Sequence, residues 1–393
     1  MKYRTFGKLD WKSSVLGFGV MRLPLLDNDP THVNEEEAIK MLHYAIDNGV
    51  NYIDTGYFYH GGKSEQIAGK SLKGSYKEKA KVAVKMPIMI VQSASDFDRL
   101  FDEQLKRLDM PKIDFYMLHG LGAASWRKLR ELGIINWAEQ KMAQGYFDYF
   151  GFSSHDEYAA FKEIIDSYDN WTFAQVQYNY MDVHRQAGIR GVKYANSKNL
   201  GVVIMEPIRG GVLAKEPPEL VAKVWETAPR QMSLAEWALQ WIWNQPEISV
   251  VLSGMSTIKQ VQENIASANR SGVGKLGQND RALINRVREA YKNLYPIPCS
   301  GCRYCMPCPN GIAIPSIFEI YNDGVAYNIP NRGTLRYQDS LLEGKRADLC
   351  VRCNKCIEVC PQKIDIPEWL EKIHELLGAS GVGQQAKPTS KQN

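Results

Sequence analysis

The stretch EEEAIKMLHYAIDNGVNYID, residues 35–54, contains one complete unit of the pattern that decides the fold. Its apolar residues recur at helical spacing and share one face, at Ala38, Met41, Leu42, Ala45 and Ile46. Gly49 ends this predicted helix, Glu35–Asn48. The following run, Asn51–Asp54, is typical of a short buried strand, and it closes on a carboxylate.

The same alternation of strand and helix continues through residues 1–295. Strands are predicted at Val15–Gly19, Asn51–Asp54, Lys81–Lys85, Asp114–Leu118, Asp148–Phe152, Phe173–Gln177, Gly201–Met205 and Ile248–Leu252. Further helices are predicted at Phe97–Leu108, Leu129–Gln144, Glu157–Tyr168, Arg185–Ser197, Leu234–Trp243, Ile258–Ala268 and Arg281–Leu294. This rhythm predicts an α/β chain with a (β/α)8 TIM barrel. An open doubly wound sheet is the alternative, but no G-x-G-x-x-G follows the first strand, where Gly17-Phe18-Gly19 continues into Val-Met-Arg.

The composition is that of an ordinary globular protein, with 44% apolar and 23% charged residues. A net charge of +4 is too small to indicate nucleic acid or a membrane surface as a partner. No apolar signal region opens the chain, and no apolar run is long enough to span a bilayer. Because the 8 cysteines are clustered and no export signal is visible, we expect a cytoplasmic protein.

All the cysteines fall into two similar runs near the end of the chain. The first run is Cys299, Cys302, Cys305 and Cys308-Pro309, and the second is Cys350, Cys353, Cys356 and Cys360-Pro361. Three thiols at this strict spacing followed by Cys-Pro are typical of four-iron cluster ligation. Two zinc sites of four thiolates each are the alternative, although zinc ribbons favour separate C-x2-C pairs. We therefore expect two [4Fe-4S] clusters.

The repeat extends beyond the thiols. Cys308-Pro-Asn-Gly-Ile-Ala-Ile-Pro315 parallels Cys360-Pro-Gln-Lys-Ile-Asp-Ile-Pro367, and a helical segment follows each, at Ser316–Tyr321 and Glu368–Leu377. The segment Gly333–Gly344 between the runs is also predicted to be helical. These features predict a barrel over residues 1–295, a mainly helical dicluster ferredoxin-like domain over 296–378, and a disordered tail over 379–393.

In two-cluster ferredoxins the fourth cysteine of each run ligates the other cluster. The resemblance therefore implies one cluster on Cys299, Cys302, Cys305 and Cys360, and the other on Cys350, Cys353, Cys356 and Cys308. The first run departs from the usual spacing, because two residues rather than three precede its last cysteine.

Polar residues close or follow successive predicted strands of the barrel: Asp54, Tyr59, Lys85 and His119. Chemistry in such barrels takes place at the C-terminal ends of the strands. Tyr59 could act as general acid if an ammonium at Lys85, anchored by Asp54, lowers the pKa of the phenol. His119 could orient a carbonyl oxygen. This set suits the reduction of a carbonyl group.

Several segments resemble the aldo-keto reductase family. They are Gly49-Val-Asn-Tyr-Ile-Asp54-Thr-Gly-Tyr-Phe-Tyr59, Val82-Ala-Val-Lys85, Ile113-Asp-Phe-Tyr-Met-Leu-His119, Leu16-Gly-Phe-Gly-Val-Met-Arg-Leu-Pro24 and Gly151-Phe-Ser-Ser154. The resemblance covers residues 1 to about 295 and includes the tetrad. It implies a (β/α)8 barrel, an extended nicotinamide coenzyme bound without a Rossmann domain, and reduction of aldehydes or ketones.

The same resemblance assigns coenzyme contacts. Ser153, Ser154 and Gln175 match positions that hold the carboxamide, with Ser154 in place of the usual Asn. Met205 stands where a tyrosine normally stacks on the nicotinamide, and Glu206 follows near the expected diphosphate. The adenosine end is assigned to Ser253, Gly254, Met255, Ser256, Gln260, Glu263 and Asn264. Gln260 replaces the arginine of NADPH-specific members, and Lys259 could compensate only partly, so the choice between NADH and NADPH stays open.

Hydride transfer moves two electrons together, whereas clusters pass one at a time, and no flavin motif joins them. In one hypothesis the protein is an NAD(P)H-dependent reductase of a small carbonyl substrate with structural, docking or sensing clusters. In a second it is an electron-transfer protein whose barrel binds a partner or nucleotide. In a third the clusters deliver electrons to the substrate, or a ferredoxin or flavoprotein serves as redox partner.

Overall fold

The computed structural model describes residues 1–27, 29–299, 301–341 and 344–378. Contacts divide the chain into two compact units, of which the first comprises residues 1–215 and 229–281 and the second begins with 216–228 and continues from 282. The division predicted after residue 295 does not include the short segment 216–228, which has no strong sequence signal of its own. The predicted tail, residues 379–393, lies outside the described residues.

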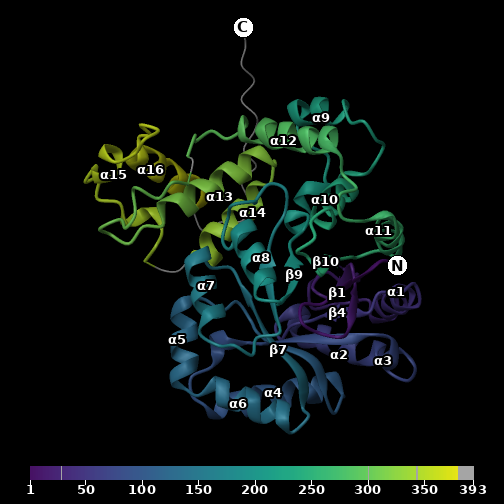
Figure 1. Ribbon diagram of the computed structural model, residues 1–393. Helices are drawn as coiled ribbons and strands as arrows, with labels where there is room; N and C mark the ends of the chain where they lie inside the picture. The colour runs from purple at the N-terminus through teal and green to yellow at the C-terminus, as the bar shows by residue number, and fades with distance from the viewer. Residues whose placement is uncertain (28, 300, 342–343, 379–393) are drawn as a thin grey trace. The chain divides into compact units, whose positions relative to one another are not determined.

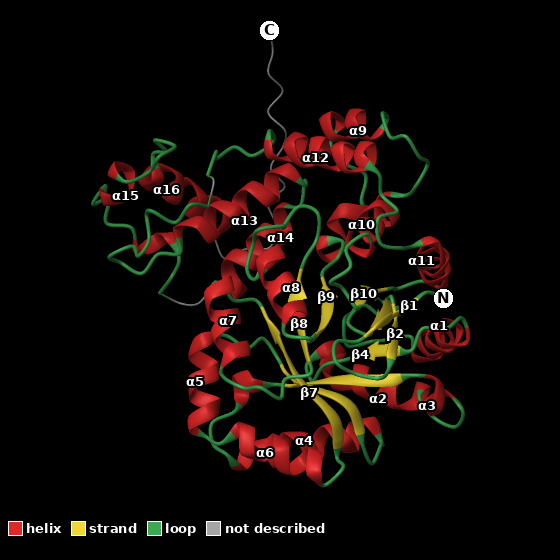
Figure 2. Ribbon diagram, viewed as in Figure 1, coloured by secondary structure: helices red, strands yellow, loops and turns green. Residues whose placement is uncertain are grey.

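The first unit is built on a closed barrel of parallel strands, in the order β10-β3-β4-β5-β6-β7-β8-β9. The strands are β3 (Leu16–Gly19), β4 (Tyr52–Asp54), β5 (Lys81–Met86), β6 (Ile113–Leu118), β7 (Phe147–Ser154), β8 (Phe173–Gln177), β9 (Gly201–Met205) and β10 (Val250–Gly254). Figure 2 shows these strands in yellow with helices around them. The predicted TIM barrel is therefore confirmed, and the largest shift is in β10, which begins two residues later than expected.

Helices cover the outside of the barrel (Figure 1). They are α1 (Glu35–Asp47), α2 (Lys63–Ser71), α3 (Tyr76–Lys79), α4 (Ser95–Leu108), α5 (Ala123–Glu131), α6 (Ile134–Ala143), α7 (Tyr158–Asp166), α8 (Gly188–Ser197), α10 (Leu234–Trp243) and α11 (Ile258–Arg270). Short 3-10 turns are η1 (Tyr59–Gly62), η2 (Ile88–Ile90) and η3 (Arg209–Ala214). The single helix predicted at Leu129–Gln144 is wrong, because Gly133 adopts a left-handed φ of 84° that separates α5 from α6.

Two apolar layers hold this unit together. The outer layer packs the helices onto the strands, and the inner layer fills the barrel with residues such as Tyr52, Ala83, Phe115, Phe173 and Val203. Successive side chains of a strand point to opposite faces, so the residues two places further on also face the interior. Those residues include Asp54, Lys85, Met117, Gln175 and Met205. The pleat thus turns polar groups of several strands toward one rim.

An N-terminal hairpin that the sequence analysis missed closes the opposite end of the barrel. It consists of β1 (Tyr3–Thr5) and β2 (Lys12–Ser14), paired antiparallel. Phe6 is fully buried in the inner layer, with its ring centroid 5.1 Å from that of Phe115. Gly201 makes room for it, because a Cβ at that position would lie 2.4 Å from the Phe6 ring. These strands are three residues long, too short for a periodicity signal.

The second unit is mainly helical. It contains α9 (Glu219–Trp225), α13 (Ile314–Ala326), α14 (Pro330–Leu335), the π-turn η4 (Arg336–Ser340), the 3-10 turn η5 (Ala347–Leu349), α15 (Lys355–Glu358) and α16 (Ile366–Leu377), while α12 (Gln278–Lys292) spans the boundary between the units. A separate apolar core joins α13 and α16 around residues such as Ile317, Phe318 and Ile373. The helix predicted within Gly333–Gly344 is confirmed only up to η4, since residues 342–343 are not described.

No helix in the described ranges combines the length and apolarity that crossing a membrane requires.

Arg4 attaches the hairpin to the end of α10, and its removal should destabilise the barrel. Its guanidinium donates to the carbonyl oxygens of Gln245 and Ile248, each at 2.7 Å, and to that of Trp243. We expect Arg4→Ala to lower the free energy of unfolding by about 2 kcal/mol, because carbonyl groups lose a charged donor. Urea unfolding measures this change, with exposed Lys2→Ala as the control. Equal stability of the two variants would contradict the assigned role.

Candidate functional site

The four residues of the predicted tetrad meet at the C-terminal rim of the barrel. Asp54 and Lys85 lie in the neighbouring strands β4 and β5, whose register pairs Asp54 with Ala83. His119 follows β6 directly, and its backbone N–H donates to the Met86 carbonyl at 3.1 Å. Tyr59 begins η1 in the loop after β4. Residues from three strands therefore surround one point, as the strand-end pattern predicted.

Lys85 and Asp54 form a buried ion pair, since Lys85 is 1% and Asp54 4% exposed. The Lys85 ammonium donates to Asp54 Oδ1 and, at 2.8 Å, to the carbonyl oxygen of Thr55. Burial alone would lower the pKa of Lys85, but the charge of Asp54, with smaller contributions from Tyr59 and from hydrogen bonds, outweighs burial and raises that pKa. Lys85 is therefore a permanent cation at neutral pH.

Tyr59 lies directly against this cation. The Lys85 Nζ is 5.0 Å from the centroid of the phenol ring. Burial raises the pKa of Tyr59, while the Lys85 charge opposes that rise. The expected net lowering of this pKa is thus wrong for the structure as it stands: Lys85 acts in the expected sense, but burial is the larger effect. Gly56 leaves space for the ring, because a Cβ there would lie 3.0 Å from two ring carbons of Tyr59.

His119 faces Tyr59 edge-on, with ring centroids 5.9 Å apart and planes at 90°. Burial first, and then the nearby charge of Lys85, lower the pKa of His119 to about 3. Its Nδ1 is buried and has no hydrogen-bond partner within the described part of the chain. A neutral imidazole at this position can offer a hydrogen bond to a carbonyl oxygen without competing for the proton of Tyr59.

The three residues predicted to contact the carboxamide differ in whether their side chains already have hydrogen-bond partners. Gln175, in β8, is buried, and its Oε1 lacks a partner among the residues that the structure describes. Ser153 pairs with Gln175 in the register of β7 and β8, and its Oγ accepts from the Gly120 N–H at 2.8 Å. Ser154 donates instead to the Leu121 carbonyl at 2.7 Å, which commits its proton to the loop after β6. Gln175 and Ser153 therefore suit an amide ligand better than Ser154.

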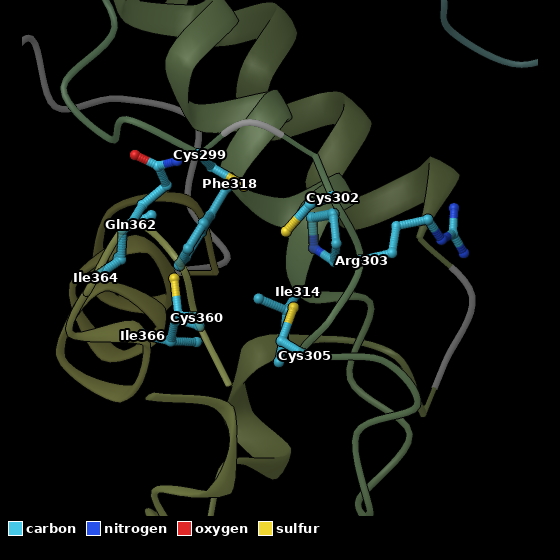
Figure 3. A pocket seen from close by; sticks show the side chains of 11 residues that line it. Cys299, Cys302, Arg303, Cys305, Ile314, Phe318, Cys360, Gln362, Ile364 and Ile366 are labelled. Atoms are coloured by element: carbon cyan, nitrogen blue, oxygen red, sulfur yellow. The ribbon is translucent and has the colours of Figure 1, made fainter. Parts of the chain in front are cut away.

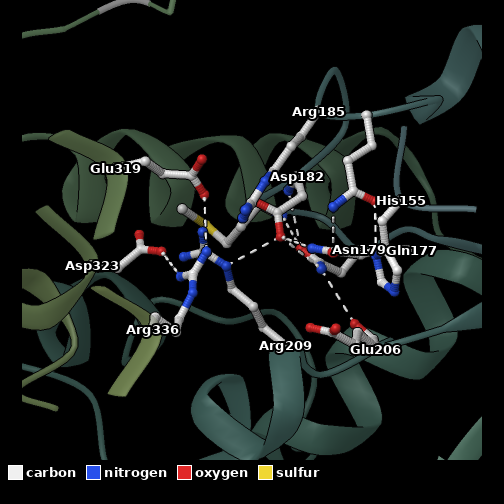
Figure 4. A network of polar contacts seen from close by, with 12 residues as sticks. His155, Gln177, Asn179, Asp182, Arg185, Glu206, Arg209, Glu319, Asp323 and Arg336 are labelled. Atoms are coloured by element: carbon white, nitrogen blue, oxygen red, sulfur yellow. Dashed lines mark hydrogen bonds and ion pairs between the residues drawn. The ribbon is translucent and has the colours of Figure 1, made fainter. Parts of the chain in front are cut away.

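A polar network that the sequence analysis missed holds the loop after β9, next to Met205. Asp182 accepts from the side-chain amides of Gln177 and Asn179, each at 3.0 Å, and from Arg209 Nε at 3.1 Å, as Figure 4 shows. Asn179 Nδ2 also donates to the carbonyl oxygen of Glu206 at 3.2 Å. The available signal was the polar run Gln177, Asn179 and Asp182, which begins at the last residue of β8 and continues into the loop after it. Glu206 is thereby held at a left-handed φ of 52°.

The predicted adenosine end lies where β10 leads into α11. Gln260 does not project freely from the helix, because its Oε1 accepts from the Ser256 N–H at 2.8 Å. Asn264 Nδ2 donates to Ser253 Oγ at 3.0 Å. Met255 is buried beneath this turn, and Glu263 lies 3.8 Å from the Lys259 ammonium. The first turn of α11 contains no arginine that could bind a 2′-phosphate in the place of Gln260.

Arg22, in the loop after β3, is a further candidate that the sequence analysis did not single out. Its side chain passes so close to Gly254 that a Cβ there would lie 2.9 Å from its Cβ and Cγ. The charge of Arg22 also lowers the pKa of Tyr59 slightly, a smaller effect than those of burial, Lys85 and Asp54. An exposed cation between the tetrad and the end of β10 is well placed for an anionic part of a ligand.

Four cysteines from both runs surround one pocket in the second unit. Figure 3 shows Cys299, Cys302, Cys305 and Cys360 around it, with the apolar residues Ile314, Phe318, Ile364 and Ile366. This is the crossed grouping that the ferredoxin resemblance implies. Four thiols around one pocket are the donor set that a cubane cluster requires, so these residues fit a cluster.

The second predicted ligand set is less enclosed. Cys350, Cys356 and Cys308 are half-buried and Cys353 is exposed. Burial raises the pKa of Cys356 to about 11, and the nearby thiols Cys350 and Cys353 contribute to that rise. Bound iron would stabilise the thiolate that burial disfavours, because a coordinated thiol is deprotonated. All eight free cysteines are thus available as ligands.

The sequence of the first unit matches the Aldo/keto reductase family over residues 15–272, well over half of the chain. This chain belongs to the aldo/keto reductase family. A second match, to a 4Fe-4S dicluster domain, covers residues 298–365. The protein is therefore an oxidoreductase of that family that carries a dicluster domain at its C-terminal end.

Similar proteins span most of both chains. L-galactose dehydrogenase from Arabidopsis thaliana is 26% identical, covering 75% of this chain and 96% of its own length. The NADH-specific methylglyoxal reductase of Escherichia coli is 24% identical, with 74% and 99% covered. Among solved structures, the holo form of aldo-keto reductase AKR11C1 from Bacillus halodurans is 25% identical, with 73% and 96% covered and a TM-score of 0.60.

The low pKa of His119 gives a direct test of the site. We expect its imidazole to stay neutral from pH 8 down to about pH 4, because burial and Lys85 disfavour the charged ring. Nitrogen-15 NMR of labelled histidines, assigned with His119→Asn, measures this titration. His32 serves as an internal control, since its hydrogen bond to Asp27 raises its pKa. A His119 that titrates together with the exposed histidines would rule out the assigned environment.

Proposed function

We propose that this aldo/keto reductase reduces a small aldehyde or ketone with NADH or NADPH, or runs the reverse reaction, and that Tyr59 supplies the proton. The observation that carries this proposal is the buried Lys85–Asp54 pair against the Tyr59 ring, opposite the neutral His119. Tyr59 and His119 are the groups that can contact one carbonyl oxygen together. Lys85 lowers the pKa of Tyr59, and Asp54 holds the Lys85 ammonium in position.

Each residue has a defined part in this reaction. His119 donates an N–H hydrogen bond to the carbonyl oxygen and fixes its position. Tyr59 transfers its proton to that oxygen as negative charge develops there. The Lys85 ammonium stabilises the phenolate that remains, and Asp54 keeps the ammonium in place. In the reverse direction the Tyr59 phenolate accepts the proton of the alcohol.

The coenzyme contacts rest on groups whose bonding is incomplete. The Oε1 of Gln175, which has no hydrogen-bond partner among the described residues, and the neighbouring Ser153 are suited to a carboxamide. When bound, the reduced nicotinamide supplies the hydride that the carbonyl carbon receives. Met205 offers a thioether surface for a flat ring, and Arg22 a charge for the diphosphate. NADH and NADPH remain alternatives, because Gln260 cannot provide bidentate capture of a 2′-phosphate.

We further propose that the dicluster domain holds two [4Fe-4S] clusters with crossed ligation. Cys299, Cys302, Cys305 and Cys360 line one pocket and would hold the first, and Cys350, Cys353, Cys356 and Cys308 the second. The match to a dicluster domain favours a second activity, in which the clusters exchange single electrons with a ferredoxin or flavoprotein. A flavin on such a partner would convert between one-electron and two-electron steps.

Substitution of Tyr59 tests the reductase. We expect Tyr59→Phe to lower kcat by at least about 100-fold with methylglyoxal or benzaldehyde, because the general acid is lost. The KM for coenzyme should change little. Tyr57→Phe is the matched control, since its hydroxyl lies in the same loop but bonds Glu103 at 2.9 Å. Unchanged carbonyl reduction by Tyr59→Phe would disprove the assignment.

Cysteine substitutions test the crossed ligation. We expect Cys360→Ser and Cys299→Ser to lose the same EPR signal and about half of the bound iron. Cys350→Ser should remove the other signal. Anaerobic purification, iron analysis and dithionite-reduced EPR measure both quantities. If Cys360→Ser matches Cys350→Ser instead, each run holds its own cluster. Addition of NADH or NADPH to the anaerobic protein then shows whether the clusters accept electrons from the coenzyme.

A further inference from the structure

A buried polar cluster lies behind the tetrad, outside the residues that would touch a substrate. It joins α2 and α4 to the two segments that carry Tyr59 and Lys85. These segments are separate, since Tyr59 follows β4 and Lys85 lies in β5. Their relative position decides how strongly the ammonium acts on the phenol. The cluster consists of Glu65, Gln104, Arg107 and Tyr116, and we call it the bridge.

Gln104 of α4 holds the peptide group of Lys85. Its Nε2 donates to the Lys85 carbonyl oxygen at 3.0 Å and to Glu65 Oε1 at 2.6 Å. The hydroxyl of Tyr116, in β6, donates to Gln104 Oε1 at 2.8 Å. Because Oε1 accepts from Tyr116, the orientation of the amide is fixed and its N–H groups face Glu65 and Lys85. Gln104, Glu65 and Tyr116 are fully buried, so water does not replace these bonds.

Arg107 of α4 holds the loop that carries Tyr59. Its Nη1 donates to the carbonyl oxygen of Tyr57 at 3.0 Å. Its guanidinium also lies over the Tyr57 ring, 4.0 Å from the centroid. Gly62, at the end of η1, admits the guanidinium, because a Cβ there would lie 3.0 Å from Nη1. Arg107 thus bonds the loop before Tyr59, at Tyr57, and lies beside it after Tyr59, at Gly62.

Glu65 of α2 connects the two anchors. One carboxylate oxygen accepts from Gln104 and the other accepts from Arg107 Nη1 at 3.2 Å. Burial raises the pKa of Glu65, while its bonds to Gln104 and Arg107 act in the opposite sense. The cost of desolvating the two charges of a buried ion pair offsets much of their attraction. Such a pair therefore fixes the positions of its side chains more than it adds to the net stability of the fold. A continuous path of bonds therefore runs from the Tyr57 carbonyl through Glu65 to the Lys85 carbonyl.

We propose that the bridge positions Tyr59 against Lys85, with Glu65 and Gln104 as positioning residues of the reductase. The inference rests on the proposed function, because it concerns the proton that Tyr59 transfers. Without the bridge, the loop and the end of β5 can move apart by a fraction of an ångström. The Lys85 charge then acts less on the phenol, and proton transfer starts from a less favourable geometry. A small misplacement of this kind can cost up to about 100-fold in rate.

The principal test compares Glu65→Gln with Glu103→Gln. Both remove one carboxylate from Arg107, but within the described part of the chain the Glu103 carboxylate is hydrogen-bonded to Arg107 and Tyr57, and not to Gln104 or Lys85. We expect Glu65→Gln to lower kcat about tenfold with benzaldehyde, with an unchanged dissociation constant for NADH or NADPH. The alkaline limb of its pH–rate profile should move to higher pH, because Lys85 lowers the pKa of Tyr59 less. Glu103→Gln should stay within about twofold of the wild type.

A swapped pair separates positioning from simple support of the fold. The double variant Glu65→Gln with Gln104→Glu restores a hydrogen bond between the two positions, but no N–H then faces the Lys85 carbonyl. Because the carboxylate at position 104 then faces the Lys85 carbonyl oxygen, we expect kcat to stay at the level of Glu65→Gln. Recovery of wild-type kcat in the double variant would overturn the inference. If Glu65→Gln does not fold, Tyr116→Phe replaces it in the test. Loss of the Tyr116 hydroxyl removes only the bond that it donates to the Gln104 amide oxygen. Wild-type kcat and an unshifted pH–rate profile for Tyr116→Phe would also overturn the inference.

The same assay contains wild-type protein and Tyr59→Phe. If wild-type protein reduces no carbonyl compound, the proposed function fails. If Tyr59→Phe abolishes the reaction while the Glu65 and Tyr116 variants match the wild type, only the bridge fails.

Discussion

The ammonium of Lys85 has to be charged and almost without water, and this requirement organises the rim of the barrel. A lone cation in such surroundings would lose its proton or unfold the site. Asp54 and the Thr55 carbonyl satisfy it; Asp54 ends the neighbouring strand β4, and Thr55 directly follows that strand. The parallel pairing of β4 and β5 is therefore also an electrostatic constraint. A slip of one residue would turn Lys85 out of the barrel, since alternate side chains face opposite sides.

The same requirement explains why the two aromatic groups next to Lys85 behave differently. Burial opposes charge on both, so it raises the pKa of Tyr59 and lowers that of His119. The Lys85 charge reinforces this effect on the imidazole and opposes it on the phenol. The result is one neutral hydrogen-bonding group and one protonated acid beside a fixed cation. The environment extends both states beyond the pH range in which they hold in water, because it moves the two pKa values further apart than their reference values of about 10 and about 6.5.

Sequence patterns predicted the barrel well because its strands are buried on both faces and stand out as short apolar runs. Ile113–Leu118 and Phe173–Gln177 are examples of strands with no exposed residue. The patterns failed where the backbone conformation of single residues decides, as at Gly133, or where an element is only three residues long, as in the hairpin. They also missed the segment 216–228, whose place in the second unit depends on contacts distant in sequence.

The tetrad was predictable because its four polar residues lie at or shortly after the ends of strands, where a polar group is conspicuous. The network around Asp182 left only a weak signal, the polar run at the end of β8, and the bridge around Glu65 left none, because polar residues on helices and loops usually face solvent. Only the fold reveals that Gln104 is buried. The sign of the net effect on Tyr59 was also beyond the sequence, since it depends on how burial compares with the charge of Lys85. The pairing of Cys360 with the first run was available only through a resemblance.

The N-terminal hairpin has a consequence for the order of assembly. Phe6 and Arg4 are synthesised long before their partners, which include Gly201 and the carbonyl groups at 243–248. Until those later segments are synthesised, the barrel lacks its last strand and the contacts of its floor, and the apolar ring of Phe6 stays exposed. Closure of the barrel therefore depends on contacts between segments that lie far apart in the chain.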